Sequence, residues 1–230
     1  MKTLPLFPSL LFLFFHVEAQ SLPAVGASTI AGTINGITIS ATVQGPAEEK
    51  TPLQIACVFE YEEGDIYNPP ALPAAVNGMQ QLDKALHGLI TDLRKSGKFS
   101  GHAFETLLIT PAAGTIPAER LLLIGLGNRQ HFTPDIMTLV GSVGMREALR
   151  LGVDRYAHAS DLKDAGIDSP TAEVAANILK GAIAAYRTQL YLQNRQMAVF
   201  KPLTGFVLLA GPAFYETTAA ALKETVATLQ

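Results

Sequence analysis

Residues 120–134, RLLLIGLGNRQHFTP, combine an apolar run, two glycines and a helix-starting pair, Thr133-Pro134. A strand, a glycine turn and a helix in this order form the frame of many phosphate-binding loops, in which backbone N–H groups hold the anion. The dinucleotide fingerprint also needs a third glycine, where Gln130 stands, and a helix that begins at the turn. Both conditions fail, so the stretch predicts a turn between a strand and a helix. The alternative is a ligand-binding site formed by four residues of the turn: Gly125, Gly127, Asn128 and Thr133.

The histidines and acids of the chain do not follow the spacing of known metal sites. The four histidines beyond residue 19 are widely spread, without HExxH and without paired cysteines: His87, His102, His131 and His158. Four acids lie close together but lack the ligand spacing of a calcium loop: Glu60, Glu62, Glu63 and Asp65. We therefore predict ordinary surface positions for His87 and His102, a solvated acidic loop, and no bound metal.

No nucleophile stands in a recognisable catalytic setting. Ser142 lies in VGSVG, which lacks the first glycine of a nucleophile elbow and falls inside a predicted helix. Cys57 lies in the apolar run LQIACVFE, where no neighbouring charge in sequence is placed to lower the pKa of its thiol. Ser100 is two residues from His102, which does not make a triad. The residues indicate neither an enzyme nor a cofactor.

The first residues predict export. A positively charged start is followed by an apolar run over residues 4–15, and Val17-Glu18-Ala19 offers small residues at the positions that a signal peptidase reads. The run is shorter than the ~20 residues that span a bilayer and contains two prolines. We predict a signal peptide over residues 1–19, a flexible arm over 20–35, and a secreted or periplasmic protein with no membrane segment after cleavage.

Composition indicates one globular domain with a sizeable core, over residues 36–230. The chain has 230 residues, of which 48% are hydrophobic and 16% charged. Its net charge of −3 gives no reason to expect nucleic acid, whose binding depends on lysine and arginine at phosphates. With one cysteine, the chain forms no internal disulfide.

The hydrophobic pattern predicts strands that alternate with helices. Strands are expected at residues 36–44, 53–60, 104–110, 120–125, 153–159 and 205–211. A first helix follows Leu82, Leu86, Leu89 and Leu93, and later helices begin at Thr133, after Ser169-Pro170 and near Pro212. The proline-rich and acidic stretch 61–78 is expected to be a long loop. This alternation favours an α/β sheet layered with helices.

The order of these segments resembles the N-terminal domain of the leucyl (cytosol) aminopeptidase family. The resemblance rests on GMQQLDKALHGLITDLRKSGKFSGHAFETLLITP, then on IPAERLLLIGLGNRQHFTPDIMTLVGSVGMREALRLGV, and on ILKGAIAAYRTQLYL. Within them, GKFSG precedes a strand and RLLLIGLG precedes an FTP helix start. The similarity runs from about Ile37 to the last helix. It implies a macro-domain-like, three-layer α/β sandwich, with a mixed sheet flanked by helices.

In that family, catalysis belongs to a C-terminal domain whose lysine, aspartates and glutamate hold two metal ions. This chain ends at Gln230 without those motifs, so no catalytic or metal-binding residue is carried over. The resemblance therefore implies a non-catalytic domain that acts in protein binding or self-assembly. The predicted signal peptide adds export, which departs from the better-known intracellular members of the family. It leaves open an accessory subunit that works with a separate peptidase chain. It also leaves open a macro-like module that binds a phosphorylated ligand.

Overall fold

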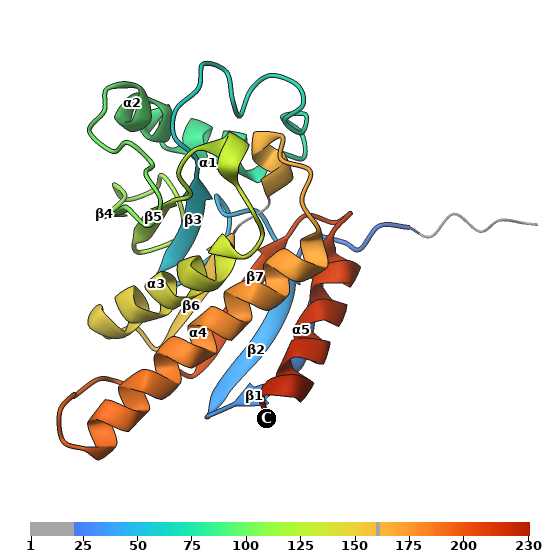
Figure 1. Cartoon of the computed structure of the whole chain (residues 1–230). Helices are drawn as coiled ribbons and strands as arrows, with labels where there is room; N and C mark the ends of the chain where they lie inside the picture. Colours follow the sequence, from blue (N-terminus) through green and yellow to red (C-terminus); the bar gives the residue numbers. More distant parts are fainter. Residues whose placement is uncertain (1–20, 160–161) are drawn as a thin grey trace, which may run out of the picture.

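A seven-stranded mixed sheet forms the centre of the molecule (Figure 1). The computed structural model describes residues 21–159 and 162–230, and the predicted signal peptide lies outside these residues. The strands stand in the order β1-β2-β7-β6-β3-β5-β4. Their bounds are β1 (Ser28–Ile34), β2 (Ile37–Val43), β3 (Gln54–Val58), β4 (Thr106–Ile109), β5 (Leu121–Gly125), β6 (Arg155–Ala159) and β7 (Gly205–Ala210).

The five inner strands run parallel, and both edge strands are antiparallel to their neighbours. β3 and β5 are buried along their whole length, which matches their unbroken apolar sequences. β2 alternates between buried and half-buried residues, as its alternating sequence predicted. All six strands expected from the hydrophobic pattern are confirmed, and β1 is an additional one.

Helices cover both faces of the sheet. On one face lie α3 (Ile136–Arg150), α4 (Thr171–Asn194) and α5 (Tyr215–Leu229), which bury one hydrophobic cluster against the sheet. On the other face, α1 (Gly78–Ala85) and α2 (Leu89–Lys95) bury a second cluster against β3 and β5. Two short 3-10 helices, η1 (Arg129–His131) and η2 (Leu162–Ala165), lie in the connections. The predicted three-layer, macro-domain-like arrangement is confirmed (Figure 1).

Glycines allow α3 and α4 to cross in close contact. A Cβ atom on Gly141 would collide with the carbonyl group of Ile178, and one on Gly181 would collide with that of Thr138. The Ser142 hydroxyl, 9% exposed, donates to the carbonyl oxygen of Gly181 at 3.0 Å across the same crossing. Ser142 is therefore a packing residue, as its place in the sequence indicated.

Three boundary predictions were wrong. Residues 28–34 of the expected flexible arm form β1, because their backbone pairs with β2 at the edge of the sheet. The expected first helix is two helices, since His87 and Gly88 take positive φ angles of 57° and 82° between them. α3 begins at Ile136 with Asp135 at its N-cap, three residues after the expected start at Thr133.

Among the described residues, no helix combines the length and the apolar character that crossing a membrane requires.

Candidate functional site

A cavity of about 290 Å³ lies at the carboxyl ends of the parallel strands. The last residues of four of them line it: Val43 of β2, Val58 of β3, Ala159 of β6 and Ala210 of β7. Open α/β sheets bind their ligands at this edge, because the loops that follow the strands diverge there and leave a crevice. The position, and a volume close to that of small-ligand sites, make this cavity the candidate functional site.

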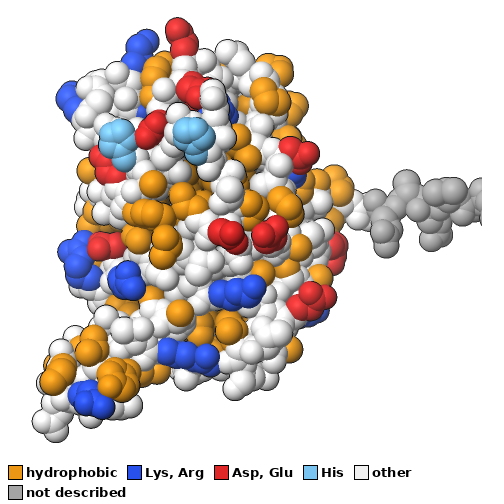
Figure 2. All heavy atoms as spheres, viewed as in Figure 1, with side chains coloured by type: hydrophobic (Ala, Val, Ile, Leu, Met, Phe, Trp, Pro, Cys, Tyr) orange, Lys and Arg blue, Asp and Glu red, His pale blue; other side chains and the backbone are white. Residues whose placement is uncertain are grey.

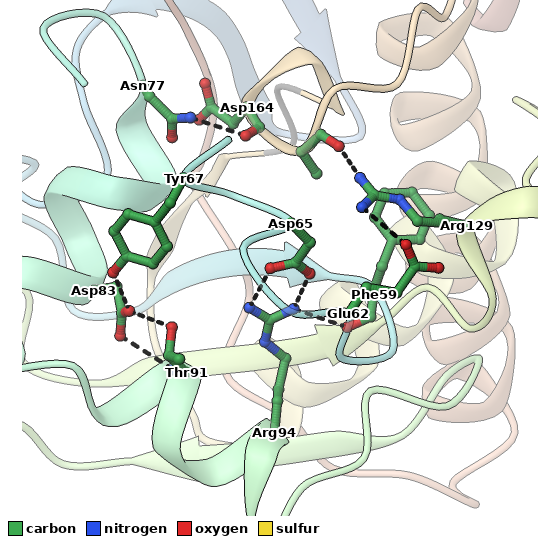
Figure 3. A network of polar contacts seen from close by, with 11 residues as sticks. Phe59, Glu62, Asp65, Tyr67, Asn77, Asp83, Thr91, Arg94, Arg129 and Asp164 are labelled. Atoms are coloured by element: carbon green, nitrogen blue, oxygen red, sulfur yellow. Dashed lines mark hydrogen bonds and ion pairs between the residues drawn. The ribbon is translucent and has the colours of Figure 1, made fainter. Parts of the chain in front are cut away.

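Residues 59–77, here called the roof segment, cross over the cavity and contribute Phe59, Asp65, Ile66, Ala75 and Val76 to its lining. A buried ion pair holds the segment to α2 (Figure 3). Arg94 donates to the two carboxylate oxygens of Asp65 at 2.5 and 3.2 Å, and also to the carbonyl oxygen of Phe59 at 3.3 Å. Both side chains of the pair are at most 2% exposed. The expected solvated loop is therefore wrong for Asp65.

A second set of contacts fixes the roof segment to the junction of α1 and α2. The carboxylate of Asp83 is fully buried and accepts hydrogen bonds from the backbone N–H of Ile90 and from the Thr91 hydroxyl. It thereby caps the start of α2, which begins after a glycine that has no capping side chain. The Tyr67 hydroxyl donates to the same carboxylate at 2.7 Å. Burial, followed by this hydrogen bond, raises the pKa of Tyr67 to about 12.

A third set ties the start of α1 to η2. The side chain of Asn77 caps α1 by accepting from the N–H of Gln80, and it donates to the carbonyl oxygen of Asp164 at 2.8 Å (Figure 3). The carboxylate of Asp164 accepts from the N–H of Met79 at 2.9 Å. The positive end of the α1 dipole is thus already in contact with a carboxylate of the chain itself.

Cys57 and His158 form a buried polar pair beside the cavity. Cys57 is among the residues that line the cavity, and its Sγ atom lies 3.4 Å from Nε2 of His158. Burial raises the pKa of the Cys57 thiol and lowers the pKa of His158 to about 3, so both groups are neutral near pH 7. Thiol nucleophiles react as the thiolate, so this pair is not arranged as an activated cysteine.

The four residues of the predicted turn site lie outside the cavity lining. The N–H groups of Gly125 and Gly127 donate to the carbonyl oxygens of Glu105 and Gly101, and Gly127 takes a φ of 77°. Asn128 accepts from the N–H of Gln130 and so caps η1, and Thr133 is exposed. Because these N–H groups already have backbone partners, the contacts favour a structural turn, and a ligand there stays a prediction.

The other candidate residues lie at the surface of the molecule. His102 is exposed and its Nδ1 lies 2.7 Å from a carboxylate oxygen of Glu60; this hydrogen bond raises the pKa of His102. Glu62 pairs with Arg129 at 3.4 Å, and Arg129 also donates to the carbonyl oxygen of Ala165 (Figure 3). Within residues 21–159 and 162–230, no group of His, Cys, Asp and Glu side chains is placed to hold a metal ion.

The model of the cytosol aminopeptidase family, N-terminal domain, matches residues 61–194. The chain belongs to this family. The match runs from the roof segment to the end of α4, and it includes the charged cavity residues Asp65, Arg94 and Asp164.

Curated relatives extend well beyond this domain. A probable cytosol aminopeptidase of Roseiflexus castenholzii is 38% identical over 130 residues, which are 56% of this chain and 26% of the relative. One from Syntrophotalea carbinolica is 32% identical over 148 residues, which are 63% of this chain and 29% of the relative. The chain thus spans less than a third of the length of these relatives.

Solved structures agree on the fold. A tomato leucine aminopeptidase mutant superposes with a TM-score of 0.55 at 20% identity, over 84% of this chain and 37% of that one. The Oceanobacillus iheyensis macrodomain with ADP gives a TM-score of 0.54 at 17% identity, over 88% of this chain and 98% of that one. This N-terminal domain of the aminopeptidase family therefore has the macro-domain-like fold.

No motif in the sequence joins the residues that border the cavity with those that hold its roof segment. Arg94 and Asp83 lie among helix residues whose spacing reads as an ordinary polar face, and Asp164 lies in a connection without a motif. The one available signal was length, since a loop of almost twenty residues in a compact domain is often functional. That signal pointed to the roof segment but not to its partners.

Proposed function

We propose that this chain is an exported, non-catalytic binding domain of the aminopeptidase family that acts by protein binding or self-assembly. The observation that carries the proposal is the projecting end of α4. There, Tyr191, Met197 and Val199 are 55%, 73% and 99% exposed. Arg195 stacks over the Tyr191 ring at 4.7 Å. Hydrophobic and basic side chains gather on this projection, at the lower left of Figure 2.

The composition of this surface suits a protein interface, where tyrosine, methionine and arginine are enriched over other surface residues. Its position supports the same function. The family match ends at Asn194, and the exposed residues Met197 and Val199 follow within a few positions. The matched region makes up less than a third of the length of these relatives. We propose that this surface binds a second copy of the chain.

The test is the molar mass of the purified chain from residue 20 onward, by size-exclusion chromatography with light scattering. We expect at least twice the mass of one chain, and a monomer for the double variant Met197→Ser with Val199→Ser. Leu139→Ser, which replaces a 54% exposed residue of α3, is the matched control and should leave the assembly intact. A monomeric parent chain would contradict self-assembly.

The relatives are probable cytosol aminopeptidases, which favours a second candidate function: an accessory subunit of a separate peptidase chain. By itself the chain should not hydrolyse leucine-p-nitroanilide, with or without manganese. Mixed with a catalytic chain of the family, it should change that chain's activity, and the Met197→Ser, Val199→Ser variant should not. Turnover by the chain alone that a chelator abolishes would contradict the non-catalytic assignment.

Export is tested independently of binding. The full chain, produced in a bacterial host, should appear in the periplasmic or extracellular fraction with its first residue at Gln20. Intact Met1 in the cytoplasmic fraction would contradict it.

A further inference from the structure

The cavity at the carboxyl edge of the sheet has mostly apolar walls. Apolar side chains from α1, η2, the roof segment and the strands line it: Val43, Val58, Ile66, Met79, Leu162 and Leu209. Apolar walls favour a ligand with an apolar body, because burying such a body removes its surface from water. The few polar groups then decide which charge the ligand carries.

Two features of the cavity would ordinarily attract an anion, and the chain already neutralises both. The guanidinium of Arg94 is held by the carboxylate of Asp65 at 2.5 Å. The start of α1 is in contact with the carboxylate of Asp164, which accepts from the N–H of Met79. A phosphate that approached either feature would meet a carboxylate first, and like charges at short range repel.

One further acid borders the cavity without a counter-charge. Glu48 is exposed and lines the cavity, and among the described residues its carboxylate forms no ion pair. The charged side chains of the lining are therefore three carboxylates, Glu48, Asp65 and Asp164, and one guanidinium. Their net charge favours a cation, since low-dielectric walls strengthen the field of charges that line a cleft.

We propose that this cavity binds a compact organic cation, an apolar body that carries a protonated amine, and that it does not bind phosphorylated ligands. The apolar walls take the body, and the ammonium lies toward Glu48. The site is separate from the projecting end of α4, so it can be present whether or not that surface binds a protein.

Three probes of the same size separate charge from shape: benzylammonium, benzyl alcohol and benzoate. Binding to the purified chain from residue 20 onward is followed by NMR chemical-shift titration at pH 7. We expect saturable binding of benzylammonium with shifts at the cavity residues, at least about tenfold weaker binding of benzyl alcohol, and none of benzoate. Benzoate, ADP or ADP-ribose binding as tightly as benzylammonium would overturn the proposal, and so would equal binding of benzyl alcohol.

Two variants place the site. Glu48→Gln removes an exposed charge without changing shape, and should weaken benzylammonium binding between about twofold and fivefold. Glu224→Gln, an exposed acid on α5, is the matched control and should bind as the parent does. Ala159→Leu adds bulk to the wall and should abolish binding, with folding checked by circular dichroism.

Failure of the cavity proposal is distinguishable from failure of the proposed function. If no probe produces saturable shifts in the cavity, the cavity proposal is overturned and the molar-mass experiment is unaffected. If the chain is monomeric but benzylammonium binds as expected, self-assembly fails and the cavity proposal stands.

Discussion

Where α3 crosses α4, two helix backbones touch with glycine at the contact, whereas at the carboxyl edge of the sheet a long segment is held over a cavity by polar side chains. The crossing is close-packed and mainly apolar, so its stability comes from burial and shape. The roof segment contains few apolar anchors, so its position depends on the Asp65–Arg94 pair and on the contacts of Asp83. A site that keeps an open cavity cannot fill itself with side chains, and polar contacts at its margin replace that packing.

The largest effect is expected from breaking the ion pair of the roof segment. Asp65→Asn leaves the guanidinium of Arg94, 3% exposed, without a counter-charge, which should cost about 3–5 kcal/mol in free energy of unfolding. Urea unfolding at pH 7 measures it. Glu62→Gln is the control. It removes the carboxylate of the more exposed Arg129–Glu62 ion pair and should change stability little. Replacing both members of the pair, Asp65→Leu with Arg94→Met, should recover much of the lost stability. If Asp65→Asn alone costs less than about 1 kcal/mol, the ion pair does not hold the roof segment in place.

At the helix crossing, Gly181→Ala should cost about 3 kcal/mol, because the added methyl group collides with the carbonyl group of Thr138 and forces the helices apart. Lys180→Ala changes the exposed neighbouring residue of the same helix and should unfold like the parent chain. Both are measured by urea unfolding. Equal stability of the two variants would mean that the crossing is looser than described.

The pH dependence of stability tests the burial of His158 in the core. Because burial lowers the pKa of His158 to about 3, the unfolded chain binds a proton there below about pH 6.5 and the folded chain does not. Stability therefore rises with pH across this window and is lost as pH falls, by about 1.4 kcal/mol per pH unit from this one group. His158→Gln should remove that slope between pH 6 and 4. Cys57→Ala, which keeps the imidazole, should retain it, and a slope unchanged by His158→Gln would contradict the neutral, buried imidazole.

The smallest effect is expected at the second contact of the roof segment. Tyr67→Phe removes one hydrogen bond to the Asp83 carboxylate, which keeps its contacts with Ile90 and Thr91. The loss should be about 1.5 kcal/mol, typical of a hydrogen bond to a charged group. Thermal unfolding measures it against Tyr191→Phe, an exposed tyrosine whose replacement should have no effect. A loss as large as that of Asp65→Asn would mean that Tyr67 rather than the ion pair holds the roof.

Sequence patterns were most informative where structure depends on neighbours along the chain. The unbroken apolar runs predicted buried β3 and β5, and the structure buries both along their whole length. Sequence patterns were least informative about where helices and strands begin and end. Apolar spacing alone could not show that Asp83 would cap a new helix at Leu89, because that capping contact joins two helices rather than neighbours on one.

The amino-acid sequence by itself determined the alternation of strands and helices, the family and the macro-domain-like fold, because these depend on periodicity and on the order of segments. Only the tertiary structure decided that residues 28–34 belong to the sheet, that Asp65 is buried against Arg94, and that four strand ends surround a cavity. The physical reason is that pairing at a sheet edge, burial of a charge and the shape of a cavity all depend on residues distant in sequence. Asp65 and Asp164 are 99 residues apart in the sequence, yet both border one cavity.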